Sequence, residues 1–101
     1  MSRDIQDARP AVRVTRDDAR SRYEGTVDGE PATVIDFTRR SDVLTFTHTG
    51  TDPRLRGHGL AGETTRQALE DVRAAGLTVE PLCSFTVAYF ADHPEVADLH
   101  A

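Results

Sequence analysis

The stretch TDPRLRGHGLAG (residues 51–62) brings three glycines, two arginines and a histidine together, between a segment typical of a strand and one typical of a helix. A helix N-terminus presents unpaired backbone N–H groups and the positive end of the helix dipole, which together favour binding of an anion such as phosphate. Gly57 and Gly59 lack a Cβ atom, so an anion could approach these amides closely. A loop that only needs glycine to turn has the same composition. The stretch therefore leaves two interpretations open, an anion-binding loop and a structural turn.

Two further side chains have chemistry to offer. Cys83 stands between a predicted strand and a predicted helix, where the helix N-terminus favours a thiolate, although a lone cysteine is also commonly an inert buried thiol. His48 lies on a predicted strand, and imidazole is a frequent general base, although the same position suits a histidine at the edge of the core. The four histidines and one cysteine show no metal-ligand spacing, so we predict no metal site.

Short strands are expected before the glycine-rich stretch. Residues 11–15 (AVRVT) alternate apolar and polar side chains, and Asp28-Gly29 favours a type I′ turn that joins residues 23–27 and 32–37 in a hairpin. The β-branched and aromatic residues of VLTFTHTGT predict a strand over residues 43–51. On that strand, strict alternation places Leu44, Phe46 and His48 on one face and Val43, Thr45, Thr47 and Thr49 on the other.

Helical periodicity follows the glycine-rich stretch. LAGETTRQALEDVRAAG repeats small and apolar residues at helical spacing and ends at Gly76, a suitable residue for the helix C-terminus. LTVEPL (77–82) predicts a short strand, and SFTVAYFADH (84–93) predicts a second helix that stops before Pro94. A right-handed crossover would place 77–82 parallel to 43–51. The predicted fold class is α/β, a mixed α+β sheet in which an antiparallel meander is followed by β-α-β-α.

Composition limits the classes of function. The 101 residues are enough for a single domain over residues 11–101, preceded by a flexible leader over residues 1–10. Twelve basic residues against 17 acidic ones give a net charge of −5, which argues against nucleic acid or an anionic membrane as partner. With no apolar run long enough to cross a bilayer, no signal-peptide core and one cysteine, we expect a cytoplasmic protein, monomeric or a small homo-oligomer.

The motifs also resemble those of a known family. RLRGHG (54–59) resembles the [Q/R]-x-x-G-x-[G/A] pyrophosphate loop of the GCN5-related N-acetyltransferases. LTFTHTGTDPRLRGHGLA and VEPLCSFTVAYFADHPEVADL resemble two patterns of its small single-domain subgroup, and the likeness covers roughly residues 20–100. The chain departs from that subgroup at Gly50-Thr51, where the pattern has Glu-Val, and at Val96, where it has an aromatic residue. The first departure removes a carboxylate that could act as a base.

The resemblance implies a GNAT-like fold with an acetyl-CoA cleft, in an enzyme that transfers acetyl from its cosubstrate acetyl-CoA to an amine acceptor. The alternative is a non-catalytic acyl-CoA-binding or interaction module of the same fold. The catalytic candidates are His48, as a base in place of the missing Glu, and Cys83, which either lines the acetyl pocket or accepts the acetyl group. A backbone donor for the oxyanion is expected near Thr49 to Thr51, where Gly50 would ease a bulge. The acceptor stays unknown, although the acidic chain suits a cationic amine. The expected acetyl-CoA-binding residues are Thr49, Thr51, Arg54, Leu55, Arg56, Gly57, His58, Gly59, Leu60 and Ala61.

Overall fold

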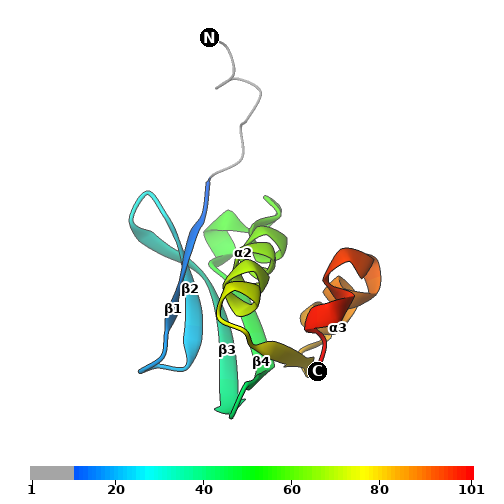
Figure 1. The fold of residues 1–101 in the computed structure, drawn as a ribbon. Coiled ribbons are helices and arrows are strands. Elements are labelled where there is room, and N and C mark those ends of the chain that lie inside the picture. Colours follow the sequence, from blue (N-terminus) through cyan, green and yellow to red (C-terminus); the bar gives the residue numbers. More distant parts are fainter. Residues whose placement is uncertain (1–10) are drawn as a thin grey trace.

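A computed structural model describes residues 11–101, so the leader expected over residues 1–10 lies outside the described residues. The elements follow the predicted order β-β-β-β-α-β-α, with short 3-10 helices after β4 and after the last α-helix (Figure 1). The strands are β1 (Arg13–Asp17), β2 (Arg22–Val27), β3 (Glu30–Arg40), β4 (Val43–Thr51) and β5 (Thr78–Pro81). The helices are η1 (Pro53–Leu55), α2 (Leu60–Ala74), α3 (Ser84–Asp92) and η2 (Pro94–Leu99).

The five strands form one mixed sheet in sequence order. β1 to β4 pair antiparallel, and β5 pairs parallel to β4 after the α2 crossover, which confirms the predicted topology. Asp28 and Gly29 have φ angles of 53° and 82°, as a type I′ turn requires at both central positions. The predicted hairpin is therefore present, and the predicted strand over residues 43–51 matches β4.

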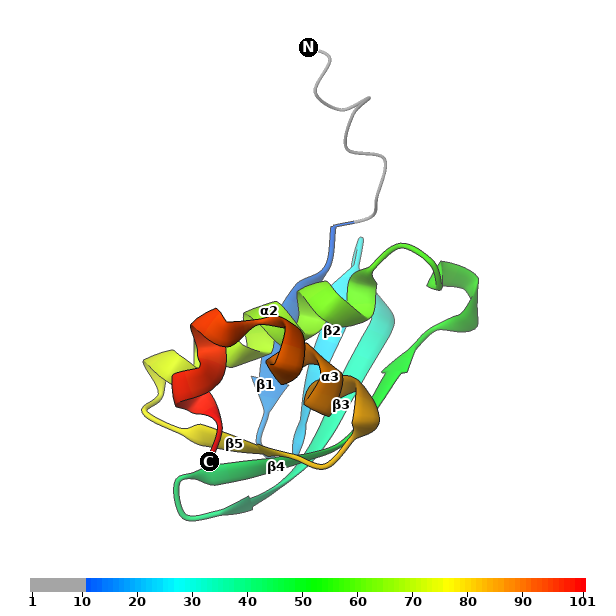
Figure 2. The ribbon, with the colours of Figure 1, turned by 90° about the vertical axis from the view of Figure 1, so that its right-hand side faces the viewer.

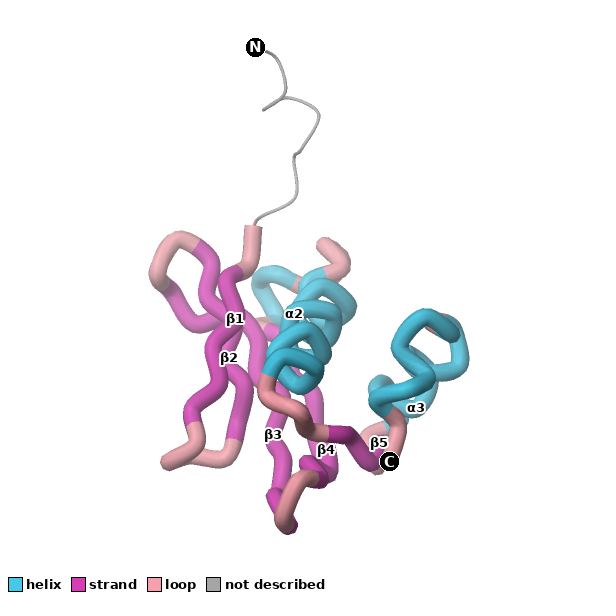
Figure 3. Tube along the Cα trace, viewed as in Figure 1, coloured by secondary structure: helices cyan, strands magenta, loops and turns pink. Residues whose placement is uncertain are grey.

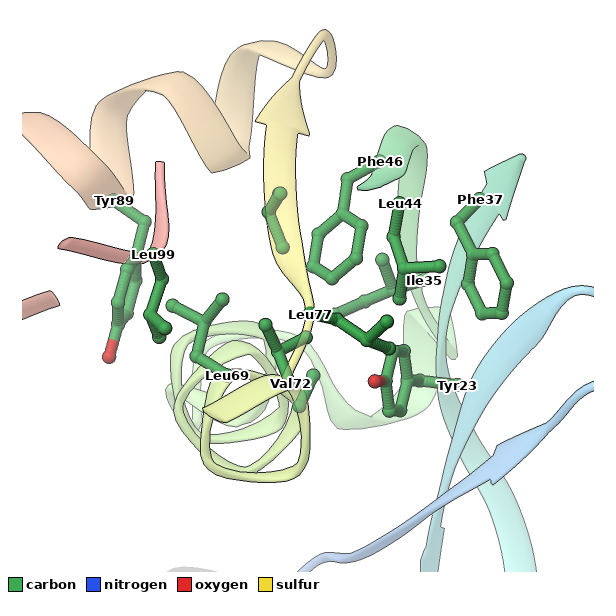
Figure 4. Packing of buried hydrophobic residues seen from close by; sticks show 12 residues of the cluster. Tyr23, Ile35, Phe37, Leu44, Phe46, Leu69, Val72, Leu77, Tyr89 and Leu99 are labelled. Atoms are coloured by element: carbon green, nitrogen blue, oxygen red, sulfur yellow. The ribbon is translucent and has the colours of Figure 1, made fainter. Parts of the chain in front are cut away.

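Both α-helices cover the same face of the sheet, and no described helix covers the other (Figures 2 and 3). Between the helices and the sheet lies a core in which the Tyr23 ring packs against Phe37 and Phe46, with centroid distances of 5.6 and 5.9 Å (Figure 4). The Tyr23 hydroxyl donates a 2.7 Å hydrogen bond to Asp71, which also pairs with Arg16 at 2.7 Å. Burial, and next the bond to Asp71, raise the pKa of Tyr23. These two contacts of Asp71 tie α2 to β1 and β2.

The strand β4 contains a bulge that overturns one prediction. Asp36 pairs with His48 but Phe37 pairs with Phe46, so Thr47 is an extra residue on β4. An extra residue reverses the alternation of side chains beyond it. His48 therefore lies on the uncovered face, and the prediction that it shares a face with Leu44 and Phe46 is wrong. The bulge also lies at Thr47, and not at Gly50 as expected.

Beyond the bulge, β4 loses its neighbour on one side. β5 pairs only with residues 43–46, and the chain then turns away as Leu82 and Cys83 both donate their N–H groups to Phe46 O at 3.0 Å. On the other side, Asp52 N donates to Ala32 O at 2.8 Å, which fixes the alternation of bonds between β3 and β4. By that alternation, the backbone groups of residues 49 and 51 face the open side, where β5 no longer runs.

The outer edge of β5 is covered by the segment that follows η2. Ala101 N donates to Val79 O at 2.7 Å, and Val79 bridges to His100. Asp98 pairs with Arg73 of α2 at 2.7 Å. The short strand β5 thus lies between β4 and this segment, with its position fixed from both sides.

Candidate functional site

A groove of about 540 Å³ follows the free edge of β4. It reaches both faces of the sheet, because the bulge turns His48 toward the uncovered face while Thr49 and Thr51 face the helices. A second groove of about 400 Å³ runs between α2 and α3, and Phe85 lines both. The first groove is lined by His48, Thr49, Gly50, Thr51, Arg56, Ala61 and Phe85.

The loop between β4 and α2 presents free backbone amides at one end of the first groove. Gly57 and Gly59 have φ angles of 87° and 74°, a region that glycine enters without strain. Gly59 is the N-cap of α2 and has no side chain to cap the helix, and the first intrahelical bond is donated by Glu63 to Gly59 O. The amides of residues 60–62 therefore have no partner within the helix. This geometry suits an anion.

The structure narrows the predicted set of loop donors. Arg54 N and Leu55 N already donate to Asp52, at 2.9 Å to its carboxylate and 2.8 Å to its carbonyl. The Arg54 guanidinium also holds the Asp52 carboxylate, at 2.8 Å, and this bond is the main reason why the pKa of Asp52 falls to about 2. Leu55 and Leu60 pack their side chains against a small apolar cluster. Among the described residues, the loop amides without a hydrogen-bond acceptor thus begin at Arg56.

Arg56 is the cation best placed for a bound anion. It lines the first groove and forms no ion pair with any described residue. The exposed His58 lies in the same loop, between the two glycines. Arg56 can therefore add charge to the amides without first breaking an internal ion pair, whereas Arg54 cannot.

Gly50 makes room for the His48 ring. A Cβ atom built on Gly50 would lie 3.2 Å from His48 Nε2 and 3.5 Å from Val34 Cγ2. Real Cβ atoms are seldom so close to a neighbour, so a side chain here would displace the imidazole. His48 is exposed and lies across from Asp36, whose carboxylate pairs with Arg22 at 3.0 Å. The imidazole is thus open to solvent at the rim of the groove.

Cys83 lies on the other side of β4 from His48. It is the N-cap of α3, and its thiol lies 3.5 Å from Thr49 Oγ1. Burial by itself raises the pKa of Cys83, but the Thr49 hydroxyl, the amides of Thr86 and Phe85 and the Thr86 hydroxyl lower it below its ordinary value. The surroundings of this half-buried sulfur therefore favour the thiolate.

The sequence-predicted residues thus fall into two groups. The groove is lined by His48, Thr49, Thr51, Arg56 and Ala61. Cys83 does not line it but contacts one of its lining residues, Thr49. The amides of Gly57, His58, Gly59 and Leu60 lie in the adjoining loop, while Arg54 and Leu55 are engaged elsewhere. Within residues 11–101 no three His, Cys, Asp or Glu side chains are grouped so that they could hold a metal ion.

Sequence reasoning missed Phe85 and Thr86. Phe85 lies in the first turn of α3, is exposed and lines the groove. An aromatic residue directly after Cys83 was the available signal in the sequence. Thr86 follows Cys83 by three residues, and this spacing places the two side chains on neighbouring positions of one helical turn. That spacing was available in the sequence as a signal.

Residues 22–99 match the sequence model of a family described as GCN5-related N-acetyltransferase. The chain belongs to this family. Among solved structures it is similar to a GCN5-like protein of Staphylococcus aureus, with a TM-score of 0.66 and 16% identity, over 88% of this chain and 87% of that one. It is also similar to the ribosomal-protein-S18-alanine N-acetyltransferase of Escherichia coli, with a TM-score of 0.59 and 13% identity, over 91% of this chain and 59% of that one. At these identities the two likenesses establish the GNAT-like fold.

No curated protein matches the chain. None of the described helices of this GCN5-related N-acetyltransferase family member is long and apolar enough to cross a membrane. Membership of this family implies acyl-CoA binding. The geometry that suits such binding lies at the free edge of β4 and in the adjoining loop.

Proposed function

We propose that this protein is an N-acetyltransferase that transfers the acetyl group of acetyl-CoA to an amine. The observation that carries the proposal is the free edge of β4, which opens beside a loop rich in unpaired amides. One end of the groove suits the phosphates of a CoA ester, and the strand edge suits the extended, amide-containing arm that joins them to the thioester.

The binding step rests on the loop. The amides from Arg56 to Ala61 would hold the pyrophosphate together with the Arg56 guanidinium, which forms no ion pair with a described residue. Charge-assisted bonds from such donors are the strong ones. Thr49 and Thr51 would bond the arm through their outward-facing backbone groups. The second groove, which shares Phe85, offers room for the rest of the cosubstrate.

The transfer step uses the two faces of β4. Acetyl-CoA occupies the helix side, while the acceptor amine approaches from the uncovered face, where His48 stands. His48 removes the proton of the amine as the neutral nitrogen attacks the thioester carbonyl, and CoA leaves as a thiolate. A backbone N–H of residue 49 or 51 stabilises the oxyanion. Cys83 lines the acetyl pocket beside Thr49. We infer a cationic amine as acceptor from the net charge of −5.

A non-catalytic acyl-CoA-binding module is the second candidate. It is favoured by Gly50, which stands where the subgroup pattern has a Glu that could serve as base. The same glycine also makes room for the imidazole of His48, which remains as a candidate base, and this supports the enzyme.

Two measurements on the wild-type protein test the proposal. Calorimetry with acetyl-CoA should show saturable binding, and release of free CoA thiol should accelerate when a polyamine, a lysine peptide or a peptide with a free N-terminus is added. Binding without acceleration by any of the amines would favour the non-catalytic module. Absence of binding would refute both candidates and leave the loop as a structural turn.

A further inference from the structure

Thr86 carries a buried hydroxyl that the fold leaves without a hydrogen bond. The residue is fully buried, and its Oγ1 is the buried side-chain atom in the described part of the chain that has no partner. A buried hydroxyl without a partner is destabilising, so an apolar residue of the same shape would serve the core better. Packing in the core therefore does not explain why residue 86 is a threonine.

The Thr86 hydroxyl lies in the first turn of α3, which has Cys83 as its N-cap. It favours the charged form of the Cys83 thiol, together with the Thr49 hydroxyl and the amides of Phe85 and Thr86. A neutral thiol is a weak acceptor and cannot use so many donors, whereas a thiolate is a strong one. The Thr86 hydroxyl can therefore donate a hydrogen bond to Cys83 when its sulfur is ionised. It could equally donate to a sulfur that leaves as a thiolate.

The sulfur also lies next to the groove. Its partner Thr49 lines that groove, and Cys83 itself is only half-buried. If the groove holds a CoA ester as proposed above, the sulfur of the cosubstrate reaches the strand edge near residue 49. Two sulfur atoms would then lie near one another, one from the protein and one from the cosubstrate.

We propose that Cys83 is a thiol–disulfide exchange site for coenzyme A, a role that rests on the proposed function. The Cys83 thiolate attacks one sulfur of CoA disulfide, a new S–S bond joins Cys83 to CoA, and the other CoA leaves as a thiolate. One disulfide is broken and one is formed, so no further oxidant is needed. The bound CoA fills the acetyl-CoA site, and a small thiol reverses the reaction. Oxidation of the CoA pool would thus switch the protein off.

The experiment is intact mass measurement without reductant after incubation with CoA disulfide. The expected result is a gain of one CoA moiety that dithiothreitol removes and that Cys83→Ser lacks. Glutathione disulfide at the same concentration should react at least about tenfold more slowly, because the loop does not hold it, and desulfo-CoA, which lacks the thiol, should protect Cys83. Equal rates with the two disulfides, or no protection by desulfo-CoA, would show that Cys83 reacts as an ordinary exposed thiol and would overturn the proposal.

The variant Thr86→Val tests whether the Thr86 hydroxyl stabilises the Cys83 thiolate or only has a structural role. Exchange with CoA disulfide should slow by about tenfold, the scale of one hydrogen bond to a charged group. The midpoint of denaturant unfolding should stay the same or rise, because the substitution removes an unsatisfied buried hydroxyl. An unchanged rate would contradict the role of Thr86. Calorimetry with acetyl-CoA on the wild-type protein is the last control. Binding of acetyl-CoA without any adduct from CoA disulfide refutes this inference alone, while absence of binding refutes the proposed function.

Discussion

The two halves of β4 have different tasks although they are one continuous strand. Residues 43–46 pair with β3 on one side and β5 on the other, and Leu44 and Phe46 are fully buried. Residues 48–51 pair with β3 alone and line the groove. The first half lies in the core and the second half forms part of the candidate site, with the bulge at Thr47 between them.

The difference shows how a small protein can build a site without a separate domain for it. The first half, which is paired on both sides, fixes the position of the strand, and the second half is held by β3 on one side while its other edge is free. The bulge reverses the alternation that the first half sets, so His48 points to the uncovered face and Thr49 to the helices. Substitutions in the first half should therefore change stability, and those in the second half should change binding or turnover.

Phe46→Ala should have the largest effect, and on stability. Phe46 is fully buried and packs on Tyr23, so its truncation should lower the free energy of unfolding by about 3–5 kcal/mol. Urea unfolding followed by circular dichroism measures this loss. Thr49→Ser in the second half is the control, with an expected change of about 1 kcal/mol or less. Equal losses in the two variants would show that the halves are not distinct.

His48→Gln should affect turnover and leave stability unchanged. Loss of a general base typically costs about 10²-fold in rate. Acetyl-CoA should bind with unchanged affinity, because His48 lies on the uncovered face, from which we propose that the acceptor approaches. Rates of CoA release with a saturating amine, taken across pH for both proteins, provide the measurement. Superimposable pH profiles would exclude His48 from proton transfer.

Gly59→Val tests the anion-binding loop. A branched side chain at the N-cap would block the approach of a phosphate to the free amides, and affinity for acetyl-CoA should weaken by about 2 kcal/mol, or about 30-fold. Gly29→Val is the matched control, since Gly29 has a similar φ of 82° in a turn with open space around it. Calorimetry on folded protein compares the two, and a loss of affinity in both would point to strain rather than to the loop.

Gly50→Ala should have the smallest effect, a modest loss of turnover caused by displacement of the His48 ring. The added Cβ would press on His48 Nε2 at 3.2 Å and push the ring from its preferred rotamer, at a cost of about 0.5–1.5 kcal/mol. Turnover should fall roughly threefold to tenfold, with little change in acetyl-CoA affinity. Gly62→Ala, where a Cβ meets nothing within 4 Å, is the control. Unchanged turnover in Gly50→Ala would show that the ring position does not matter.

Much of the fold was predictable because local rules and the tertiary structure agree. Asp28-Gly29 needs positive φ angles and so defines its hairpin, and Gly76, at φ 74°, ends α2 as expected. The bulge at Thr47 was not predictable, because VLTFTHTGT alternates well enough for a regular strand. Only the pairing with β3 reveals the extra residue, and pairing is a non-local property.

The site was predictable in its members more than in its geometry. The motifs around His48 and Gly57 indicated which residues to consider, but the face on which His48 lies depends on the bulge. The engagement of Arg54 with Asp52 was also hidden, because an arginine beside a phosphate-type loop suits an ion pair and an anion equally well. Which partner it takes depends on loop geometry that composition does not encode.

The edge left open between β4 and β5 also has a consequence for the dynamics of the molecule. Unpaired backbone groups at a sheet edge exchange their amide hydrogens readily, and they are a template for pairing with another chain. A ligand laid along residues 49 to 51 would act as a surrogate strand and complete the hydrogen-bond ladder that β5 abandons at Pro81. Cosubstrate and fold would then be coupled, since whatever fills the gap also protects the edge and adds its binding free energy to the stability of the sheet.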